Sequence, residues 1–294
     1  MHFLKKRFPK KIRFRNEIFF HPEYSLEIHN LHNFYSESLQ RTVHTDVYLP
    51  PGHFSDERNS YPTLFLNDGQ DMPAIGLADT LEKLYAKNKI PKIIAVAIHA
   101  NENRMQEYGT AGRPDYKKRG RKAQAYAGFL LKELIPELQK RYRIAKTAGQ
   151  TAIAGFSLGG LSAFDLAWNH PGAFGNVGVF SGSLWWRSKA FTPDAPDANR
   201  IVHEMVAGSS RRDGLRFWFQ AGTKDEEEDR NNNGVIDAID DTLSLIGELK
   251  ALGYQEGRDI KYVEVKGGRH NPATWGKVMP DFLQWVFRFQ PKQL

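Results

Sequence analysis

The chain has 294 residues and a mass of 33.6 kDa, enough to bury one large hydrophobic core or two small ones. Hydrophobic residues make up 40% of the sequence and charged residues 26%, an ordinary composition for a globular protein. Cysteine is absent, which excludes disulfide bonds, thiolate nucleophiles and cysteine-ligated zinc.

The net charge of +7 is concentrated at the N-terminus, where the first fifteen residues contain seven cations and no acid. An arm of this kind could touch phosphate or anionic lipid, but terminal segments are often loosely held, so we expect residues 1–20 to be a solvated basic arm. The cluster KKRGRK at 117–122 is expected to be solvated in the same way. The sequence therefore predicts no nucleic-acid partner.

No apolar run approaches the roughly 18 residues that a membrane span requires. The start, MHFLKKRFPKKIRFRNEIFF, lacks the continuous apolar stretch of a secretory signal. We therefore expect no membrane span and a cytoplasmic location. The oligomeric state is not indicated by any pattern in the sequence.

The first half of the chain predicts antiparallel strands followed by buried strands and helices. Residues 25–50 alternate between apolar and polar, which is typical of antiparallel strands. YPTLFLNDG and KIIAVAIHA are short apolar runs typical of strands covered on both faces, and LADTLEKLYAKNKI between them has helical spacing. AQAYAGFLLKELIPELQKRYR predicts a second helix with a kink at Pro136.

The second half alternates strands and helices. TAIAGF, GNVGVFSGS, LRFWFQAG and IKYVEVKGG predict strands, and LGGLSAFDLAWNHP, TLSLIGELKALG and TWGKVMPDFLQWVFRF predict helices. This order predicts an α/β fold with a mostly parallel central sheet, helices on both faces and antiparallel N-terminal strands. No repeat or linker interrupts it, so residues 21–294 are expected to form a single domain. Sites in such folds lie beyond the carboxyl ends of the strands.

A G-x-S-x-G pattern, Gly155-Phe156-Ser157-Leu158-Gly159, stands where a predicted strand ends and a helix begins. Small residues on both sides of Ser157 would permit the sharp turn that exposes a nucleophilic serine in α/β-hydrolases. The alternative is a glycine-rich turn whose serine only caps the helix. The position predicts Ser157 as a nucleophile, provided that a base and an acid follow.

In α/β-hydrolases the triad runs in the order serine, acid, histidine. Three histidines follow Ser157. His170 ends the helix that begins at the turn, where a capping role fits better, and His203 precedes the strand LRFWFQAG, which breaks the order. His270 directly follows the strand IKYVEVKGG and is the predicted base.

The predicted acid is Asp225, the first carboxylate after the strand LRFWFQAG. It lies nearest to the scaffold and is therefore the most firmly positioned. Glu226, Glu227 and Glu228 follow immediately and remain alternatives.

Two backbone N–H groups are expected to form the oxyanion hole. Leu158, the residue after the nucleophile, supplies one of them. The other should come from LFLNDGQD, where Gly69 permits a tight turn and Gln70 is the predicted donor.

The chain resembles the esterase D or putative esterase family of α/β-hydrolases, which includes enterochelin esterases and feruloyl esterases. The resemblance rests on VYLPPG, YPTLFLNDGQDM, AGFSLGGLSAFDLAWNHPGAFG, FSGSLWW, AGTKDE, GGRHNPATW and PDFLQW. It implies the same nucleophile, acid, base and oxyanion donors. It also implies substrate contacts at Arg104, Tyr108, Trp185 and Trp186, although one tryptophan could equally belong to the core and Arg104 could be a structural ion-pair partner.

The segment DRNNNGVIDAID at 229–240 follows the ligand pattern of an EF-hand calcium loop. Its ligand positions are Asp229, Asn231, Asn233, Val235 through its carbonyl, Asp237 and Asp240. The twelfth position is Asp where Glu is usual, and no helix precedes the loop. A structural Ca²⁺ is therefore one expectation, and a solvated asparagine-rich loop, a magnesium site or an empty site are the alternatives.

Together these residues predict a serine esterase that needs no organic cofactor and acts on a small-molecule or carbohydrate-linked ester. An acyltransferase using the same residues, a non-catalytic siderophore- or carbohydrate-binding homologue, and a nucleic-acid binder acting through the basic arm are the alternatives.

Overall fold

The structure is a computed structural model that describes residues 25–55 and 60–289. The predicted basic arm lies outside the described residues. Within them, eight strands form one sheet in the order β1-β2-β4-β3-β5-β6-β7-β8. The strands are β1 (Glu27–Ser36), β2 (Arg41–Leu49), β3 (Thr63–Asn67), β4 (Ile94–Ile98), β5 (Thr151–Phe156), β6 (Asn176–Phe180), β7 (Arg216–Lys224) and β8 (Ile260–Arg269).

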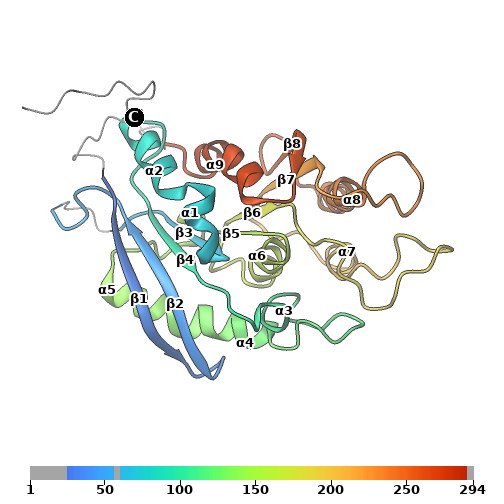
Figure 1. Ribbon diagram of the computed structural model, residues 1–294, viewed down its shortest axis with the longest axis horizontal. Helices are drawn as coiled ribbons and strands as arrows, with labels where there is room; N and C mark the ends of the chain where they lie inside the picture. The colour runs from blue at the N-terminus through green and yellow to red at the C-terminus, as the bar shows by residue number, and fades with distance from the viewer. Residues whose placement is uncertain (1–24, 56–59, 290–294) are drawn as a thin grey trace, which may run out of the picture.

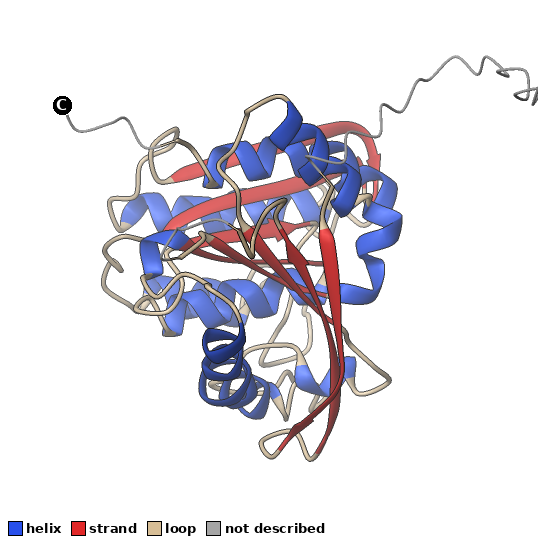
Figure 2. Cartoon of the chain, turned by 90° about the vertical axis from the view of Figure 1, so that its left-hand side faces the viewer, coloured by secondary structure: helices blue, strands red, loops and turns tan. Residues whose placement is uncertain are grey.

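The sheet confirms the predicted mixture of strand directions. Strand β1 pairs with β2, and β2 with β4, in antiparallel register, whereas all pairs from β4 to β8 are parallel. Every residue of β3, β4, β5 and β6 is buried, as expected for apolar strands covered on both faces. Figure 2 shows the twist of this sheet and the long β1–β2 hairpin that extends beyond it.

Helices cover both faces of the sheet (Figure 1). On one face lie α1 (Met72–Ile75), α2 (Leu77–Ala86) and α9 (Pro272–Val286), and on the other lie α4 (Ala123–Gly128), α5 (Ile135–Arg141), α6 (Leu158–Asn169), α7 (Ile201–Ala207) and α8 (Asp237–Ala251). The short helix α3 (Arg104–Glu107) follows β4. The pattern-based reading did not predict α1, α3 or α7, because each spans two turns or fewer and is too short to show clear periodicity.

Where the sequence predicts a kink at Pro136, the structure has a wider helical turn just before this residue. Residues Phe129–Leu134 form a π-helix between α4 and α5, and the N–H of Ile135 bonds to the carbonyl of Leu130, five residues back. Proline has no N–H and its ring crowds the preceding turn, so a wider turn upstream lets the helix continue.

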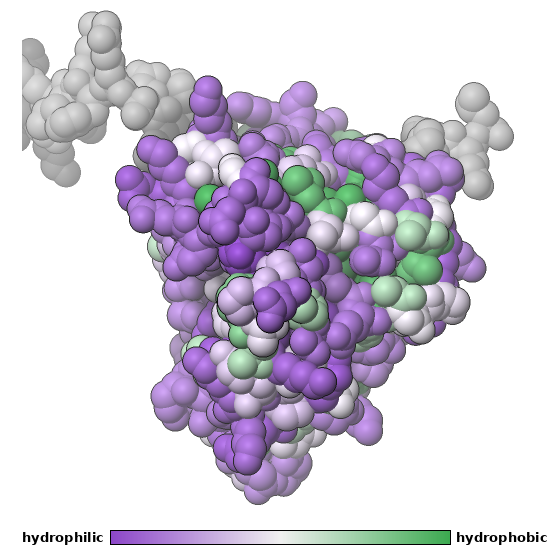
Figure 3. Space-filling model, turned by 90° about the vertical axis from the view of Figure 1, so that its right-hand side faces the viewer, coloured by the Kyte–Doolittle hydropathy of each residue, from purple (hydrophilic) through white to green (hydrophobic). Residues whose placement is uncertain are grey.

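The long loops after β4, β6 and β7 extend to the right in Figure 1, beyond the carboxyl ends of these strands. Figure 3 looks onto these loops and shows a mostly hydrophilic face with small apolar patches. This edge is where the predicted nucleophile, acid and base all lie. None of the helices within residues 25–55 and 60–289 is long and apolar enough to cross a membrane.

Candidate active site

Ser157 stands at the turn between β5 and α6 in a strained backbone conformation, with φ 56° and ψ −123°. Its N–H donates to the carbonyl of Phe180 on the neighbouring strand at 2.9 Å. A Cβ atom on Gly155 would overlap the carbonyl oxygen of Gly159, so the strand and the helix can meet this closely only with glycine at 155. Positive φ at a non-glycine residue is uncommon and concentrates at functional sites. The turn therefore has the shape that exposes a nucleophile.

Ser157 Oγ lies 3.4 Å from Ser183 Oγ, and Ser183 N–H donates to the Ser157 carbonyl at 3.0 Å. Ser183 is buried and comes from the loop that follows β6. Among the described residues, Ser157 makes no hydrogen bond to His270. The hydroxyl that lies against the predicted nucleophile is therefore that of Ser183, which the sequence did not single out.

Asp225 and His270 occupy equivalent places at the ends of two paired strands. Lys224 on β7 pairs with Arg269 on β8, so the next residue of each strand emerges at the same edge of the sheet. Asp225 Oδ2 accepts the N–H of Gly222 at 2.9 Å, while its other oxygen is buried and has no hydrogen-bond partner in the described chain. The negative charge of Asp225 acts on His270 and favours the protonated ring. A buried carboxylate oxygen without a partner is therefore carried at the end of β7, the strand paired with the one that leads to the predicted base.

The ring of His270 packs edge-on against Trp275 of α9, with ring centroids 5.4 Å apart. Partial desolvation lowers the pKa of His270 below its usual value; Asp225 opposes this shift, and the guanidinium of Arg104 adds to it. Arg104 lies in α3, after β4, so a charge from that segment also acts on His270. A neutral imidazole near neutral pH is the form that can accept a proton.

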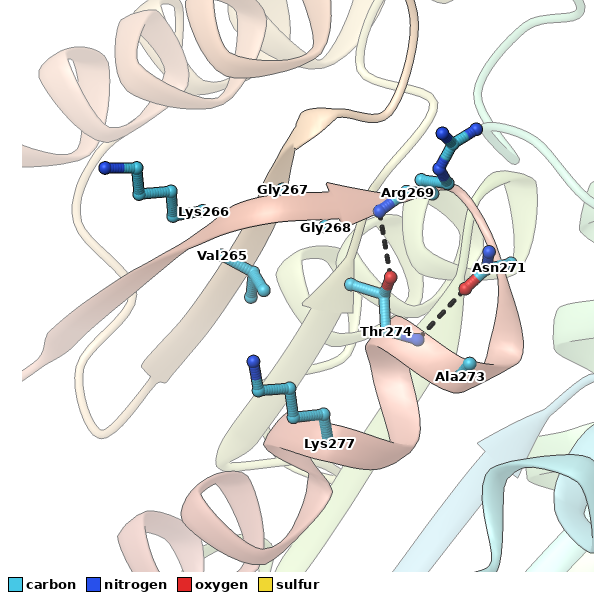
Figure 4. Close-up of a pocket in the computed structure, with 9 residues that line it drawn as sticks. All are labelled: Val265, Lys266, Gly267, Gly268, Arg269, Asn271, Ala273, Thr274 and Lys277. Carbon is cyan, nitrogen blue, oxygen red and sulfur yellow. Dashed lines mark hydrogen bonds between the residues drawn. The ribbon is translucent and has the colours of Figure 1, made fainter.

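A cavity of about 240 Å³ lies between the end of β8 and the first turn of α9 (Figure 4). It is lined by Val265, Lys266, Gly267, Gly268, Arg269, Asn271, Ala273, Thr274 and Lys277. Asn271 caps α9 by accepting the N–H of Thr274, and the hydroxyl of Thr274 accepts the N–H of Arg269. These bonds fix the segment that carries His270 on both sides.

The other candidate bases and acids face elsewhere. His203 is buried, its Nε2 lies 2.9 Å from the carbonyl of Asp241, and burial lowers its pKa to about 3. His170 lies at the end of α6, where its N–H bonds to the carbonyl of Leu166. Burial raises the pKa of Glu226 to about 7, and the backbone of Ala238 in α8 partly opposes this rise. None of these three side chains forms a hydrogen bond or an ion pair with β8 in the part of the chain that the structure describes.

The loop after β3 carries the predicted oxyanion donor Gln70. The left-handed residue here is Asp68, with φ 60° and ψ 48°, rather than Gly69. Gly69 is needed for another reason, because a Cβ there would lie 2.7 Å from the backbone of Ala97 and 2.8 Å from the ring of His99. The side chain of Gln70 accepts the N–H of Ala100 and donates to Asp68. The close packing of Gly69 on β4 thus holds the Gln70 backbone in place.

Arg104 is engaged by a buried carboxylate. It donates to Asp68 through Nε at 2.6 Å and Nη2 at 2.8 Å, and it also donates to the carbonyl of Phe156, next to Ser157. Tyr108 is buried and its hydroxyl accepts the N–H of Asp68 at 3.1 Å. In this structure Arg104 therefore forms a structural ion pair with Asp68, which was the alternative to a substrate contact. Tyr108 lies in the interior and presents no surface for a substrate here.

Trp185 and Trp186 differ in exposure. Trp186 is fully buried, whereas 38% of Trp185 is exposed. The guanidinium of Arg119 lies over both rings, 5.1 Å and 4.8 Å from their centroids. Of the four predicted substrate contacts, only Arg104 and Trp185 are therefore accessible to solvent.

The predicted calcium loop folds around its own side chains. Asp229 accepts the N–H groups of Asn233 and Gly234, Asn233 accepts that of Val235, and Asn231 donates to Asp240. No group of three or more His, Asp or Glu side chains gathers closely enough to hold a metal ion in residues 25–55 and 60–289. The calcium prediction stays a prediction.

A guanidinium contacts the acids at the end of this loop. Arg230 lies 3.1 Å from Asp237, 3.5 Å from Asp240 and 2.8 Å from the buried Asp241. It also bonds to Asp197 in the loop after β6 at 2.6 Å. Arg230 therefore ties the loop that follows Asp225 to α8 and to the segment downstream of Trp185.

Two of the residues missed in the sequence had a usable signal. Asp68 and Ser183 stand near the carboxyl ends of two of the predicted strands, the same placement that led to the predicted nucleophile, acid and base. Arg230 had none, because its partners come from two separate segments, the loop after β6 and α8.

The putative esterase family matches residues 36–286. The uncharacterized protein YbbA of Bacillus subtilis is 23% identical over 246 residues, which cover 82% of this chain and 91% of that protein. An endo-1,4-beta-xylanase/feruloyl esterase of Xylanibacter ruminicola is 24% identical over 264 residues, 87% of this chain but only 31% of that longer protein.

Solved structures share the fold. A ferulic acid esterase superimposes with a TM-score of 0.68 at 18% identity, covering 90% of this chain and 99% of that one. The enterobactin esterase of Shigella flexneri, solved in the presence of enterobactin, gives a TM-score of 0.68 at 21% identity, covering 90% and 59%. The chain therefore belongs to the putative esterase family, has the α/β-hydrolase fold and is a carboxylic ester hydrolase.

Proposed function

We propose that the protein hydrolyses small-molecule or carbohydrate-linked carboxylic esters through an acyl-enzyme on Ser157, with His270 as base and Asp225 as acid. The observation that carries this proposal is the strained turn at Ser157, at the same edge of the sheet as Asp225 and His270. A serine hydroxyl is a weak nucleophile and needs a base that is itself oriented by an acid. Membership of an esterase family agrees with this assignment.

In the first step Ser157 Oγ exchanges Ser183 for His270 as its partner, transfers its proton to the ring and attacks the ester carbonyl carbon. Catalytic hydrogen bonds are commonly long before substrate binds, so the Ser183 contact is compatible with this exchange. The N–H groups of Leu158 and Gln70 bind the developing oxyanion. The leaving alcohol takes the proton from His270 as the carbon–oxygen bond of the ester breaks.

In the second step a water molecule gives a proton to His270 and attacks the acyl carbon. The ester bond to Ser157 breaks, the acid product leaves, and Ser157 recovers its proton. Asp225 stays ionised and stabilises the charged ring in both steps.

The test is the turnover of 4-nitrophenyl acetate and butyrate, methyl ferulate and a catecholate ester by wild type and Ser157→Ala. We expect the variant to lose at least about a thousandfold in kcat. Equal rates in the two proteins would contradict the mechanism and favour a non-catalytic binding protein. An alcohol that outcompetes water for the acyl group would instead identify a transferase.

A further inference from the structure

Four exposed cations stand together on the loop between α3 and α4. They are Lys117, Lys118, Arg121 and Lys122, here called the cationic lip. No ion pair neutralises any of them among residues 25–55 and 60–289; Arg121 makes only a hydrogen bond of 3.5 Å, to the side chain of Gln106. Unpaired like charges repel one another, so their grouping leaves a positive field at this place.

The loop that carries the lip is held in one shape by a buried carboxylate. Asp115 is buried, and its side chain accepts the backbone N–H groups of Lys117 and Arg119 at 3.0 Å and 2.7 Å. It also accepts Arg119 Nε at 2.6 Å. The backbone of Lys118 is left-handed, with φ 59°, and its N–H bonds back to the carbonyl of Asp115. The four cations are exposed to solvent, as the sequence predicted, and the backbone that carries them is held in one shape.

A chain of contacts joins the lip to the nucleophile. Arg119, between Lys118 and Arg121, lies over the ring of the exposed Trp185. Trp185 follows Ser183 by two residues, and the hydroxyl of Ser183 touches that of Ser157. The loop is also fastened to this segment by the N–H of Tyr116, which bonds to the carbonyl of Arg187 at 3.0 Å.

Aromatic faces accompany the charges. Tyr116 is 42% exposed and lies below the ammonium of Lys117, 5.6 Å from the ring centroid. Together with Trp185 it offers flat apolar surface beside cations, on the side of the molecule where the loops after β4 and β6 extend in Figure 1. A ring or sugar face can pack on the aromatic side chains while an attached anion meets the lysines.

We propose that the cationic lip selects esters that carry a negatively charged group, holding the anion while the ester bond lies at Ser157. This inference rests on the proposed esterase function and adds the substrate class. The attraction between exposed lysines and an anion extends over about a Debye length, which shortens as salt is added. The preference for charged esters should therefore be strong at low ionic strength and weak at high ionic strength.

The test uses a matched pair of substrates, 4-acetoxybenzoate and its methyl ester, which differ in one negative charge. The ratio of their kcat/KM values is measured for wild type, for Lys117→Gln/Lys118→Gln/Lys122→Gln, and for the control Lys83→Gln/Lys87→Gln/Lys89→Gln. The control removes the same number of charges from exposed positions at and just beyond α2, on the opposite side of the molecule (Figure 1).

We expect kcat/KM for the charged ester, divided by kcat/KM for the neutral ester, to fall at least fivefold in the lip variant because KM for the charged ester rises. In the control variant this ratio should stay at the wild-type value. Added salt should lower the wild-type ratio toward that of the lip variant. An equal fall in both variants, or no fall in the lip variant, would overturn the proposal. 4-Acetoxyphenyl phosphate and mono-4-nitrophenyl succinate extend the test to phosphate and to an anion on the acyl side.

A binding measurement separates this inference from the proposed mechanism. Calorimetric titration of Ser157→Ala with 4-acetoxybenzoate, with and without the three lip substitutions, reports on the lip without turnover. Weaker binding of 4-acetoxybenzoate in the lip variant would support an anion-binding role of the cationic lip, even if Ser157→Ala kept esterase activity. Identical binding with and without the lip substitutions would overturn the anion-binding role of the cationic lip and leave the serine mechanism intact.

Discussion

Asp68 and Arg104 form a two-point ion pair at the carboxyl ends of β3 and β4, with nitrogen–oxygen distances of 2.6 and 2.8 Å. Asp68 is buried and precedes the loop of Gln70, while Arg104 also reaches the carbonyl of Phe156. The pair therefore fixes the predicted oxyanion loop against the turn at Ser157.

Removing one partner of this pair should be costly. Arg104→Met leaves a buried carboxylate without its cation, and we expect a loss of about 3–5 kcal/mol in the free energy of unfolding together with a lower kcat. Urea denaturation and 4-nitrophenyl acetate hydrolysis measure the two effects. Arg141→Met, which breaks an exposed pair with Glu137, is the control and should change neither quantity. Equal behaviour of the two variants would contradict this role.

The triad acid can be identified by comparing two adjacent carboxylates. The charge of Asp225 raises the pKa of His270, whereas Glu226 is not among the groups that shift it. Asp225→Asn should lower kcat by about 10³–10⁴, because the imidazolium loses its stabilising charge, whereas Glu226→Gln should retain most activity. The reverse order would assign the acid to Glu226.

The pH dependence follows from the lowered pKa of His270. The base must be neutral, so activity is lost as the pH falls through this pKa, and the acid limb of kcat/KM should lie below the usual value of 6.5. Asp225 raises the pKa of His270, so Asp225→Asn should move the limb of the residual activity to lower pH. A pH–rate profile from about pH 4 to 8 tests both statements; a limb above 6.5 would contradict the first.

Two glycines should respond oppositely to alanine. A Cβ at Gly155 would overlap the carbonyl of Gly159, so Gly155→Ala should displace Ser157 and abolish turnover or folding. Gly247 lies within α8 with open space around it, and Gly247→Ala should stabilise the protein by about 0.5–1 kcal/mol. Thermal melts and ester hydrolysis distinguish the outcomes; an active, stable Gly155→Ala protein would show that the turn tolerates a side chain.

Calcium binding by residues 229–240 is open to a direct test. If the loop holds Ca²⁺, about millimolar calcium should raise the melting temperature, and Asp229→Ala with Asp237→Ala should abolish the rise. Arg230→Met is the informative comparison, because Arg230 contacts Asp237 and Asp240. A rise in Arg230→Met but none in wild type would show that the guanidinium already serves as the cation.

The alternation of strands and helices, the fold class and the places of Ser157, Asp225 and His270 all follow from local patterns. Burial on both faces demands continuous apolar strands, a sharp strand-to-helix turn demands small residues, and chain order pairs each polar residue with a strand end. The family resemblance is confirmed by the match over residues 36–286.

Which residues from distant segments contact one another was decided only by the tertiary structure. Arg104 is bound to Asp68, 36 residues away, and Trp186 is buried while its neighbour Trp185 is exposed, because partner choice depends on which loops converge. The segment 117–122 looks like an ordinary solvated run in the sequence. Its backbone shape comes from one buried carboxylate, Asp115, and its place in the fold from contacts with the loop after β6. Sequence periodicity reports which residues are buried, but the partners of a buried charge are set by packing across the whole sheet.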